Sequence, residues 1–109
     1  MQLINIPFGI TDWEKIGEEE HKGTKGTSFW RVQKFGDIRV RIVRYSPGYV
    51  ADHWCSKGHI ILCLDGEVVI ETKDGQEHSL NTGMSFQVAD NDIPHLTSSK
   101  TGAKIFIVD

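Results

Sequence analysis

Residues 48–66 read GYVADHWCSKGHIILCLDG, and this stretch decides the fold. It contains two β-type runs, Tyr49 to Cys55 and His59 to Leu64, separated by the turn residues 56–58, and Asp65-Gly66 then turns the chain again. Short runs of this kind, bounded by turn residues at regular intervals, are typical of an all-β sandwich or barrel. The stretch therefore predicts an all-β domain with its chemistry-bearing residues on or beside strands.

The same pattern extends on both sides of this stretch. Between Ile38 and Tyr45, apolar residues alternate with Arg39 and Arg41, which predicts a buried apolar face and a solvated arginine face. Asp74-Gly75 predicts a tight hairpin, because glycine tolerates the positive φ of such turns. The other predicted strands cover residues 28–35, 67–73, 76–80, 84–89, 95–98 and 103–108.

The N-terminal quarter of the chain differs from the rest. Thr11-Asp12-Trp13-Glu14 has the form of a capping box and predicts one short helical turn that ends before Gly17. Residues 18–26 are charged, contain glycine and lack apolar periodicity, which predicts a solvated loop. We therefore expect a single domain over residues 1–109, with an extension at 1–26 and the barrel at 27–109.

Charge and composition exclude several classes of partner. The formal net charge of −3 gives no attraction to phosphate backbones, so we expect no nucleic-acid partner. The longest apolar run, Ile60 to Leu64, is far shorter than the roughly 20 residues of a spanning helix, so we expect no membrane partner. Residues 1–6 show no secretory signal, which predicts a cytoplasmic protein whose two cysteines, Cys55 and Cys63, remain thiols.

Four side chains could together hold a metal ion. His53 and Cys55 are two residues apart on a predicted strand, so they leave the same face, and His59 begins the next strand. His95, directly after Pro94, could supply a fourth ligand from a later strand. Imidazole and thiolate are usual ligands for zinc, iron, nickel and copper. The sequence predicts one divalent ion, zinc first and iron, nickel or copper as alternatives, held by His53, Cys55, His59 and His95.

Other candidate residues are weaker. His21 lies in the predicted charged loop and His78 in the predicted hairpin, where surface positions are the simpler interpretation. Cys63 shares the parity of His59 but lies about 13 Å further along the strand, which favours a place in the core. Gln87 could reach the cavity and orient a ligand, although a surface position explains it equally well.

The candidate ligands lie within a sequence pattern that resembles the cupins. The residues that carry the resemblance are Gly48, His53, Cys55, His59 and Gly66 in a first motif, and Gly83, Pro94 and His95 in a second. Cys55 replaces a histidine of the first motif, and His59 replaces its glutamate. The resemblance covers residues 38–108 and implies a jelly-roll barrel, also called a double-stranded β-helix, with a metal site and pairing as a homodimer.

A narrower resemblance rests on Asp52-His53-Trp54-Cys55. The segment is similar to the Asp-His-Cys-Trp signature of a group of small bacterial cupins, with Trp54 and Cys55 in the opposite order. Members of that group carry no assigned activity. This resemblance therefore supports the fold and the metal site more than any reaction.

Three functions are compatible with a metal site of this kind. The first is a metal-dependent enzyme that acts on a small organic molecule in the barrel mouth, and the second is a binding or sensing module with a structural metal. The third, a redox sensor that uses Cys55, ranks last because no resolving cysteine lies nearby. No nucleophile triad, carboxylate pair or phosphate loop identifies a reaction, so no catalytic residue is assigned.

Overall fold

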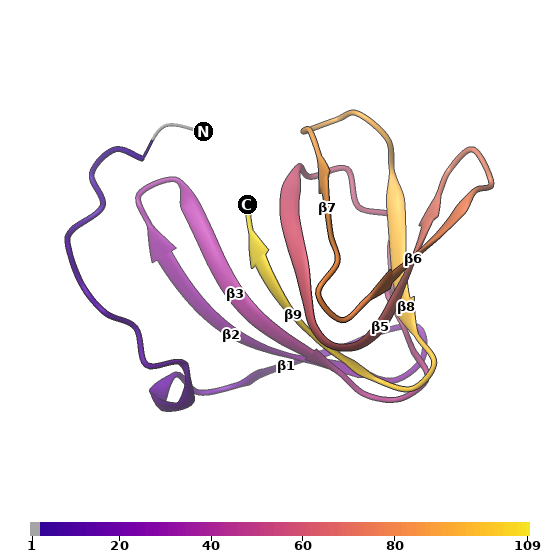
Figure 1. Ribbon diagram of the computed structural model, residues 1–109, viewed down its shortest axis with the longest axis horizontal. Coiled ribbons are helices and arrows are strands. Elements are labelled where there is room, and N and C mark those ends of the chain that lie inside the picture. The colour runs from indigo at the N-terminus through magenta and orange to yellow at the C-terminus, as the bar shows by residue number, and fades with distance from the viewer. Residues whose placement is uncertain (1–2) are drawn as a thin grey trace.

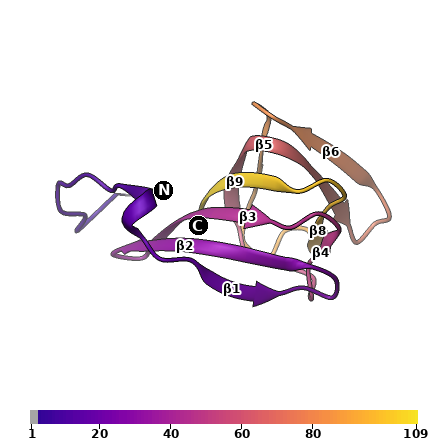
Figure 2. The same cartoon turned by 90° about the horizontal axis from the view of Figure 1, so that it is seen from below.

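A computed structural model describes residues 3–109, which form a curled antiparallel sheet with one short 3-10 turn (Figures 1 and 2). The elements in chain order are η1 (Trp13–Lys15), β1 (Glu19–Lys22), β2 (Thr27–Phe35), β3 (Ile38–Tyr45), β4 (Tyr49–Val50), β5 (His59–Thr72), β6 (Glu77–Asn81), β7 (Ser85–Val88), β8 (His95–Ser99) and β9 (Ala103–Val108). The strand order is β1-β2-β3-β9-β5-β8-β4, and β6 and β7 also pair with β5. An all-β domain was predicted from the strand pattern, and the structure confirms it.

The long strand β5 joins the two halves of the curled sheet. Its first half pairs with β7 and β9, and its second half pairs with β6 and β8. The register shifts between Cys63 and Asp65, and Gly66 adopts a φ of +81°, which allows the strand to bend there. The predicted turn at Asp65-Gly66 is thus a bulge within one strand, whereas the hairpin at Asp74-Gly75 is present as predicted, with a φ of +88° at Gly75.

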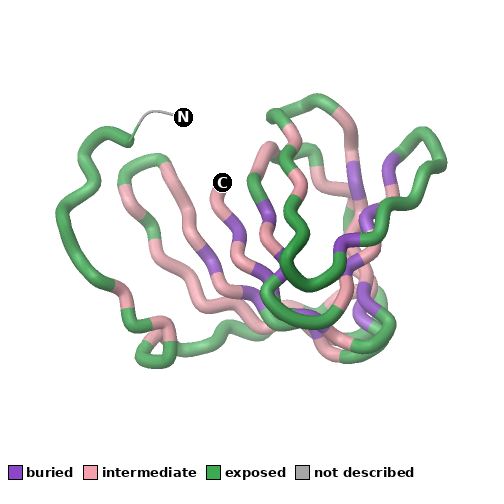
Figure 3. Tube along the Cα trace, viewed as in Figure 1, coloured by how far each residue is buried: buried purple, intermediate pink, exposed green. Residues whose placement is uncertain are grey.

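The apolar core lies inside the curl and is formed mainly by β3, β5 and β9 (Figure 3). Ile105 and Val68 have no exposed surface, and Cys63 is 1% exposed, which confirms its predicted place in the core. The full set of buried apolar residues is Val43, Tyr45, Tyr49, Ile61, Cys63, Val68, Ile70, Leu80, Ala103, Ile105 and Ile107. Val43, Tyr45, Tyr49, Ile61 and Ile107 also line a cavity, so the core forms its apolar wall.

The inward face of β3 is the opposite of the predicted one. Arg41, Val43 and Tyr45 are buried and point inward, whereas Ile42 is half-buried on the outer face. On that outer face, β9 places Phe106 opposite Ile42, and the ring of Trp13 packs edge-on against Phe106 at 6.5 Å. Trp13 of the N-terminal turn therefore packs over the outer apolar side of the sheet, whereas Arg39 and Arg41 line the cavity.

The N-terminal segment also differs from the prediction. Residues 18–26 were predicted to be a loop but contain strand β1, which pairs with β2. The backbone supplies this pairing, and one half-buried side chain faces inward, so the strand forms without apolar periodicity. His21 is that side chain, and its ring stacks on Trp30 at 3.8 Å. The predicted helical turn is present as η1, but Asp12 rather than Thr11 caps it by accepting a hydrogen bond from the Glu14 backbone N–H.

Helical structure in residues 3–109 is confined to this three-residue turn. None of it is long or apolar enough to cross a membrane.

Residues 51–58 form an irregular segment instead of the predicted strand from Tyr49 to Cys55. Strand β4 ends at Val50, and Cys55 is then tied to His95 by an isolated antiparallel bridge. Its two hydrogen bonds run from the Cys55 N–H to the His95 carbonyl at 2.8 Å and from the His95 N–H to the Cys55 carbonyl at 3.0 Å. This bridge fixes Cys55 beside the start of β8.

Candidate metal centre

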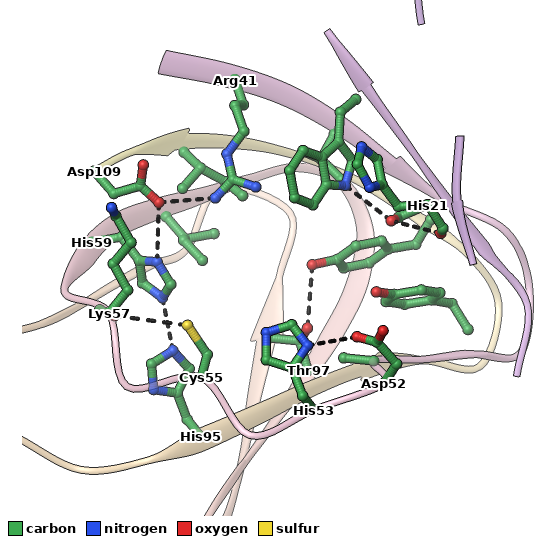
Figure 4. A pocket seen from close by; sticks show the side chains of 18 of the residues that line it. His21, Arg41, Asp52, His53, Cys55, Lys57, His59, His95, Thr97 and Asp109 are labelled. Atoms are coloured by element: carbon green, nitrogen blue, oxygen red, sulfur yellow. Dashed lines mark hydrogen bonds and ion pairs between the residues drawn. The ribbon is translucent and has the colours of Figure 1, made fainter. Parts of the chain in front are cut away.

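Three of the four predicted metal ligands converge at one wall of the cavity (Figure 4). His59 begins β5, His95 begins β8, and Cys55 is held beside His95 by the backbone bridge. One donor atom from each residue lies within 4.8 Å of the other two. These atoms are close enough to share an ion, since zinc binds histidine nitrogen at about 2.0–2.1 Å and cysteine sulfur at about 2.3 Å.

The two histidines of this cluster face each other through their Nε2 atoms, which are 2.7 Å apart. His95 Nδ1 lies 3.1 Å from the Ile93 carbonyl, which can only accept a hydrogen bond, so Nδ1 carries the proton and Nε2 keeps a lone pair. Burial lowers the pKa of His95, although its hydrogen bond to Ile93 opposes this shift. A neutral imidazole with a free Nε2 lone pair is the form that binds a metal ion.

Behind His59 lies a buried carboxylate, Asp109, which the sequence analysis did not identify. The Asp109 Oδ2 atom is 3.6 Å from His59 Nδ1, and the Asp109 side chain has no exposed surface. Arg39 donates to it from Nε at 2.9 Å and from Nη2 at 3.0 Å, and Arg41 donates from Nη2 at 2.9 Å. Carboxylates in this position orient a ligating histidine and set its tautomer.

The charge state of Asp109 follows from these contacts. Burial alone would raise the pKa of Asp109, but its polar contacts with His59 and Arg39 and the charge of Arg41 outweigh burial. Together they hold the pKa of Asp109 well below its usual range, so the carboxylate is ionised. The hydrogen bond to Asp109 also raises the pKa of Arg39. An ionised carboxylate behind His59 supports the tautomer that leaves His59 Nε2 free for a metal ion.

His53, the fourth predicted ligand, lies outside the cluster. Its Nδ1 is 2.6 Å from Asp52 Oδ1, and its side chain is 74% exposed at the rim of the cavity. The prediction placed His53 and Cys55 on one strand face, but residues 51–58 are not a strand, so the two-residue spacing no longer aligns their side chains. The structure brings Cys55, His59 and His95 together and leaves His53 apart.

Gln87 also lies apart from the cluster. It is exposed on β7 and lines a second, smaller hollow of about 230 Å³, which His95 also lines. The half-buried neighbour Phe86 points inward instead, and its ring lies edge-on to both His59 and His95. A role for Gln87 in ligand binding stays a prediction.

The cavity in front of the cluster has a volume of about 470 Å³, within the usual range for small-molecule sites. Tyr45 and Tyr49 stack on each other in its wall, with ring centroids 4.4 Å apart. The Tyr45 hydroxyl lies 3.3 Å from Thr97 Oγ1. Hydroxyl and aromatic groups thus line the space between the polar end at Arg41 and the apolar core.

These tyrosines predict an alkaline transition. Burial raises the pKa of Tyr45 to about 12 and also raises that of Tyr49, and the chain contains no other tyrosine. Because the folded state holds these protons more tightly than the unfolded state, keeping both tyrosines neutral stabilises the fold. This stabilisation is complete below the unfolded pKa of about 10 and is lost as the pH rises towards 12. Tyrosinate absorbance should therefore appear above pH 10 in the folded protein and near pH 10 in urea. Overlapping titrations in the two states would contradict the burial of both rings.

Known structures place this architecture among the cupins. No protein-family model matches the sequence, and no curated protein matches it. An RmlC-like cupin from Shewanella frigidimarina is 14% identical over 96% of this chain and 92% of its own, with a TM-score of 0.76. A predicted oxalate decarboxylase from Thermotoga maritima is 16% identical over 92% of this chain and 96% of its own, with a TM-score of 0.77.

A third similar structure is the ectoine synthase from P. lautus, which is 15% identical over 93% of this chain and 76% of its own, with a TM-score of 0.74. At such identities the similarity shows the fold alone. The chain therefore has the cupin-type jelly-roll fold, as the motif resemblance predicted. Its relation to the narrower Asp-His-Cys-Trp group stays a prediction.

Proposed function

We propose that this protein is a metal-dependent enzyme that acts on a small organic molecule in the barrel cavity, with Cys55, His59 and His95 as the metal ligands. The observation that carries this proposal is that, among residues 3–109, three donors rather than four come together at the cavity wall. Three protein ligands leave one position of a tetrahedral ion open to water or substrate, which is the arrangement of catalytic sites. The fourth predicted ligand, His53, points to solvent instead.

The donor set suits a divalent ion of intermediate softness. Two neutral imidazoles and one thiolate are compatible with zinc, which ranks first here, and with iron, nickel or copper. His59 Nε2 and His95 Nε2 lie 2.7 Å apart, a distance at which two lone pairs repel each other, so the pair calls for a shared proton or for the positive charge of an ion that both residues would bind. A bound ion would supply Lewis-acid chemistry, that is, polarisation of a substrate oxygen or activation of water.

The protein's own residues position this chemistry. The carboxylate of Asp109 faces His59 Nδ1 at ion-pair distance, and the Ile93 carbonyl accepts a hydrogen bond from His95 Nδ1. The backbone bridge holds Cys55 in register with His95. The cavity wall, with Tyr45 and its neighbours, would exclude water from one side of a bound substrate.

One observation favours a second function, a non-catalytic binding or sensing module with a structural metal. His53 lies on the irregular segment that carries Cys55 and lines the same cavity. A rotation of His53 towards the cluster would complete a Cys/His₃ set, and structural zinc sites are closed by four protein ligands. The two functions differ in whether an exchangeable position remains on the ion.

Coordination chemistry tests the choice between them. We expect protein purified without added metal to contain about one ion per chain by elemental analysis, because the three donors are preassembled. After cobalt substitution, azide should change the visible spectrum, since it takes the open position. A spectrum that azide leaves unchanged would indicate the closed structural site, and the absence of any retained ion would contradict both functions.

The oligomeric state and the location of the protein stay predictions. A homodimer is supported by the exposed apolar side chains of the N-terminal segment, among which Phe8 is 99% and Ile10 92% exposed. Within residues 3–109, strand β1 pairs with β2 alone and leaves its other edge unpaired. The proposed small-molecule partner follows from the cavity, whereas the cytoplasmic location rests on the sequence alone.

A further inference from the structure

A continuous row of polar and aromatic side chains crosses the inner face of the sheet on adjacent strands. It contains His21 on β1, Trp30 on β2, Arg41 on β3, Asp109 after β9 and His59 on β5. Figure 4 labels His21, Arg41, Asp109 and His59. His21 stacks on Trp30 at 3.8 Å, and the guanidinium carbon of Arg41 lies 4.4 Å from the centre of the Trp30 ring. Arg41 Nη2 then donates to Asp109, whose Oδ2 lies 3.6 Å from His59 Nδ1. The row thus connects the Arg41 end of the cavity to the candidate metal centre.

The cavity carries an excess of positive charge although the chain as a whole is acidic. Its cationic lining residues are Lys22, Arg39, Arg41 and Lys57, and its anionic ones are Glu20, Asp52 and Asp109. The net charge of the chain is −3. At the buried end, both arginines pair with the side chain of Asp109, which leaves an excess of one positive charge among these three side chains. Such a charge attracts anions strongly in a partly buried, low-dielectric site.

The donors at this end are also incompletely satisfied. The Arg41 side chain is 7% exposed, and its Nε has no hydrogen-bond partner within residues 3–109. The buried Nε2 of His21 has no partner in the same part of the chain. Burial lowers the pKa of Arg41 despite the attraction of Asp109, as expected for an undercompensated guanidinium. A buried polar group without a partner calls for one, and the cavity that Arg41 and His21 line offers a place where a bound molecule or an ordered water can supply it.

We propose that the cavity takes a small organic monocarboxylate, whose carboxylate group is held by Arg41 while its organic part lies against Tyr45 and Tyr49. This inference names the substrate class of the proposed enzyme and therefore rests on the proposed function. A guanidinium matches the planar geometry of a carboxylate. One excess positive charge balances one carboxylate, whereas a phosphate dianion would leave a buried negative charge. His21 Nε2 offers a further polar contact to the bound molecule.

Calorimetric titration of the purified protein with benzoate and with its neutral analogue benzamide tests this inference. We expect benzoate to bind at least about tenfold more tightly than benzamide, because charge pairing with Arg41 is lost in the amide. This comparison needs no variant. Equal affinity for the two compounds, no binding of benzoate, or tighter binding of inorganic phosphate would each overturn the proposal.

Arginine variants assign the site. Arg41→Gln should weaken benzoate binding by about tenfold or more and leave benzamide binding unchanged. Arg44→Gln is the matched control, since Arg44 lies on the same strand with its side chain 51% exposed and paired to Glu18, and it should bind benzoate normally. If Arg41→Gln does not fold, Arg41→Lys keeps the charge without the planar fork and should show an intermediate loss. Unchanged benzoate binding in the folded Arg41 variant would overturn the assignment.

Repeating the titration after metal removal by a chelator separates the two proposals. The benzoate preference should survive, because Arg41 is not a metal ligand. A protein that binds no metal but still prefers benzoate would contradict the proposed enzyme and leave the anion site in place. A protein that binds metal but does not prefer benzoate would contradict the anion site alone.

Discussion

Asp109→Asn is expected to lower the free energy of unfolding by about 3–5 kcal/mol, the usual cost of breaking a buried ion pair by removing one partner. Asp109 has no exposed side-chain surface and accepts hydrogen bonds from both Arg39 and Arg41. An asparagine carries no charge to neutralise the two guanidinium groups, and its NH₂ group would face the N–H groups of an arginine, so neither could accept a hydrogen bond. Urea unfolding followed by circular dichroism measures the loss.

The same substitution should weaken metal binding by about 10–100-fold, the range for residues that support a ligating histidine. Asp52→Asn is the matched control. Asp52 also contacts a histidine, but that pair is exposed, with side chains 60% and 74% accessible, so we expect a change in stability below about 1 kcal/mol. Equal effects of the two substitutions on stability would show that Asp109 does not organise the site.

Removal of any one ligand should have the largest effect on metal binding. We expect Cys55→Ala, His59→Ala and His95→Ala each to reduce metal affinity by more than about a hundredfold, because even supporting residues contribute 10–100-fold. Competition with a chromophoric chelator measures the affinity, and circular dichroism confirms that each variant is folded.

His53→Ala is the control for this series. It removes a histidine from the same irregular segment, but its ring is exposed and bound to Asp52, so metal affinity should be unchanged. If His53→Ala also loses the ion, the site has four protein ligands, and the structural-metal function gains support over the enzyme. If the three other variants keep the ion, the cluster is not the metal site.

Three of the four predicted ligands lie together in the structure, and their places relative to turns explain why the sequence could group them. Turn residues separate Cys55 from His59, and Pro94 precedes His95, so each lies at or near a strand end on the rim of the barrel. His53 was grouped with Cys55 on the assumption of a strand, and one irregular segment removed that alignment. Spacing predicts shared faces only where the backbone is regular.

Arg41 and Asp109 could not be identified in the same way. Alternation along β3 shows that two faces exist but not which one is inner: Arg41 faces the cavity on the same side as Val43 and Tyr45, whereas Ile42 lies on the outer face. Asp109 follows β9 and is 68 positions from Arg41 in the sequence, so no local pattern connects them. Only the pairing of β3 with β9 brings their side chains together.

The backbone bridge between Cys55 and His95 has a thermodynamic consequence. Since each residue's amide binds the other's carbonyl, two of the three proposed ligands form a preorganised chelate whose spacing is set by main-chain geometry. To bind an ion, the protein would then have to order only the side chains of Cys55 and His95 and the position of His59. The entropic cost of loading is correspondingly small, and exchange of one ion for another would leave the barrel itself undisturbed.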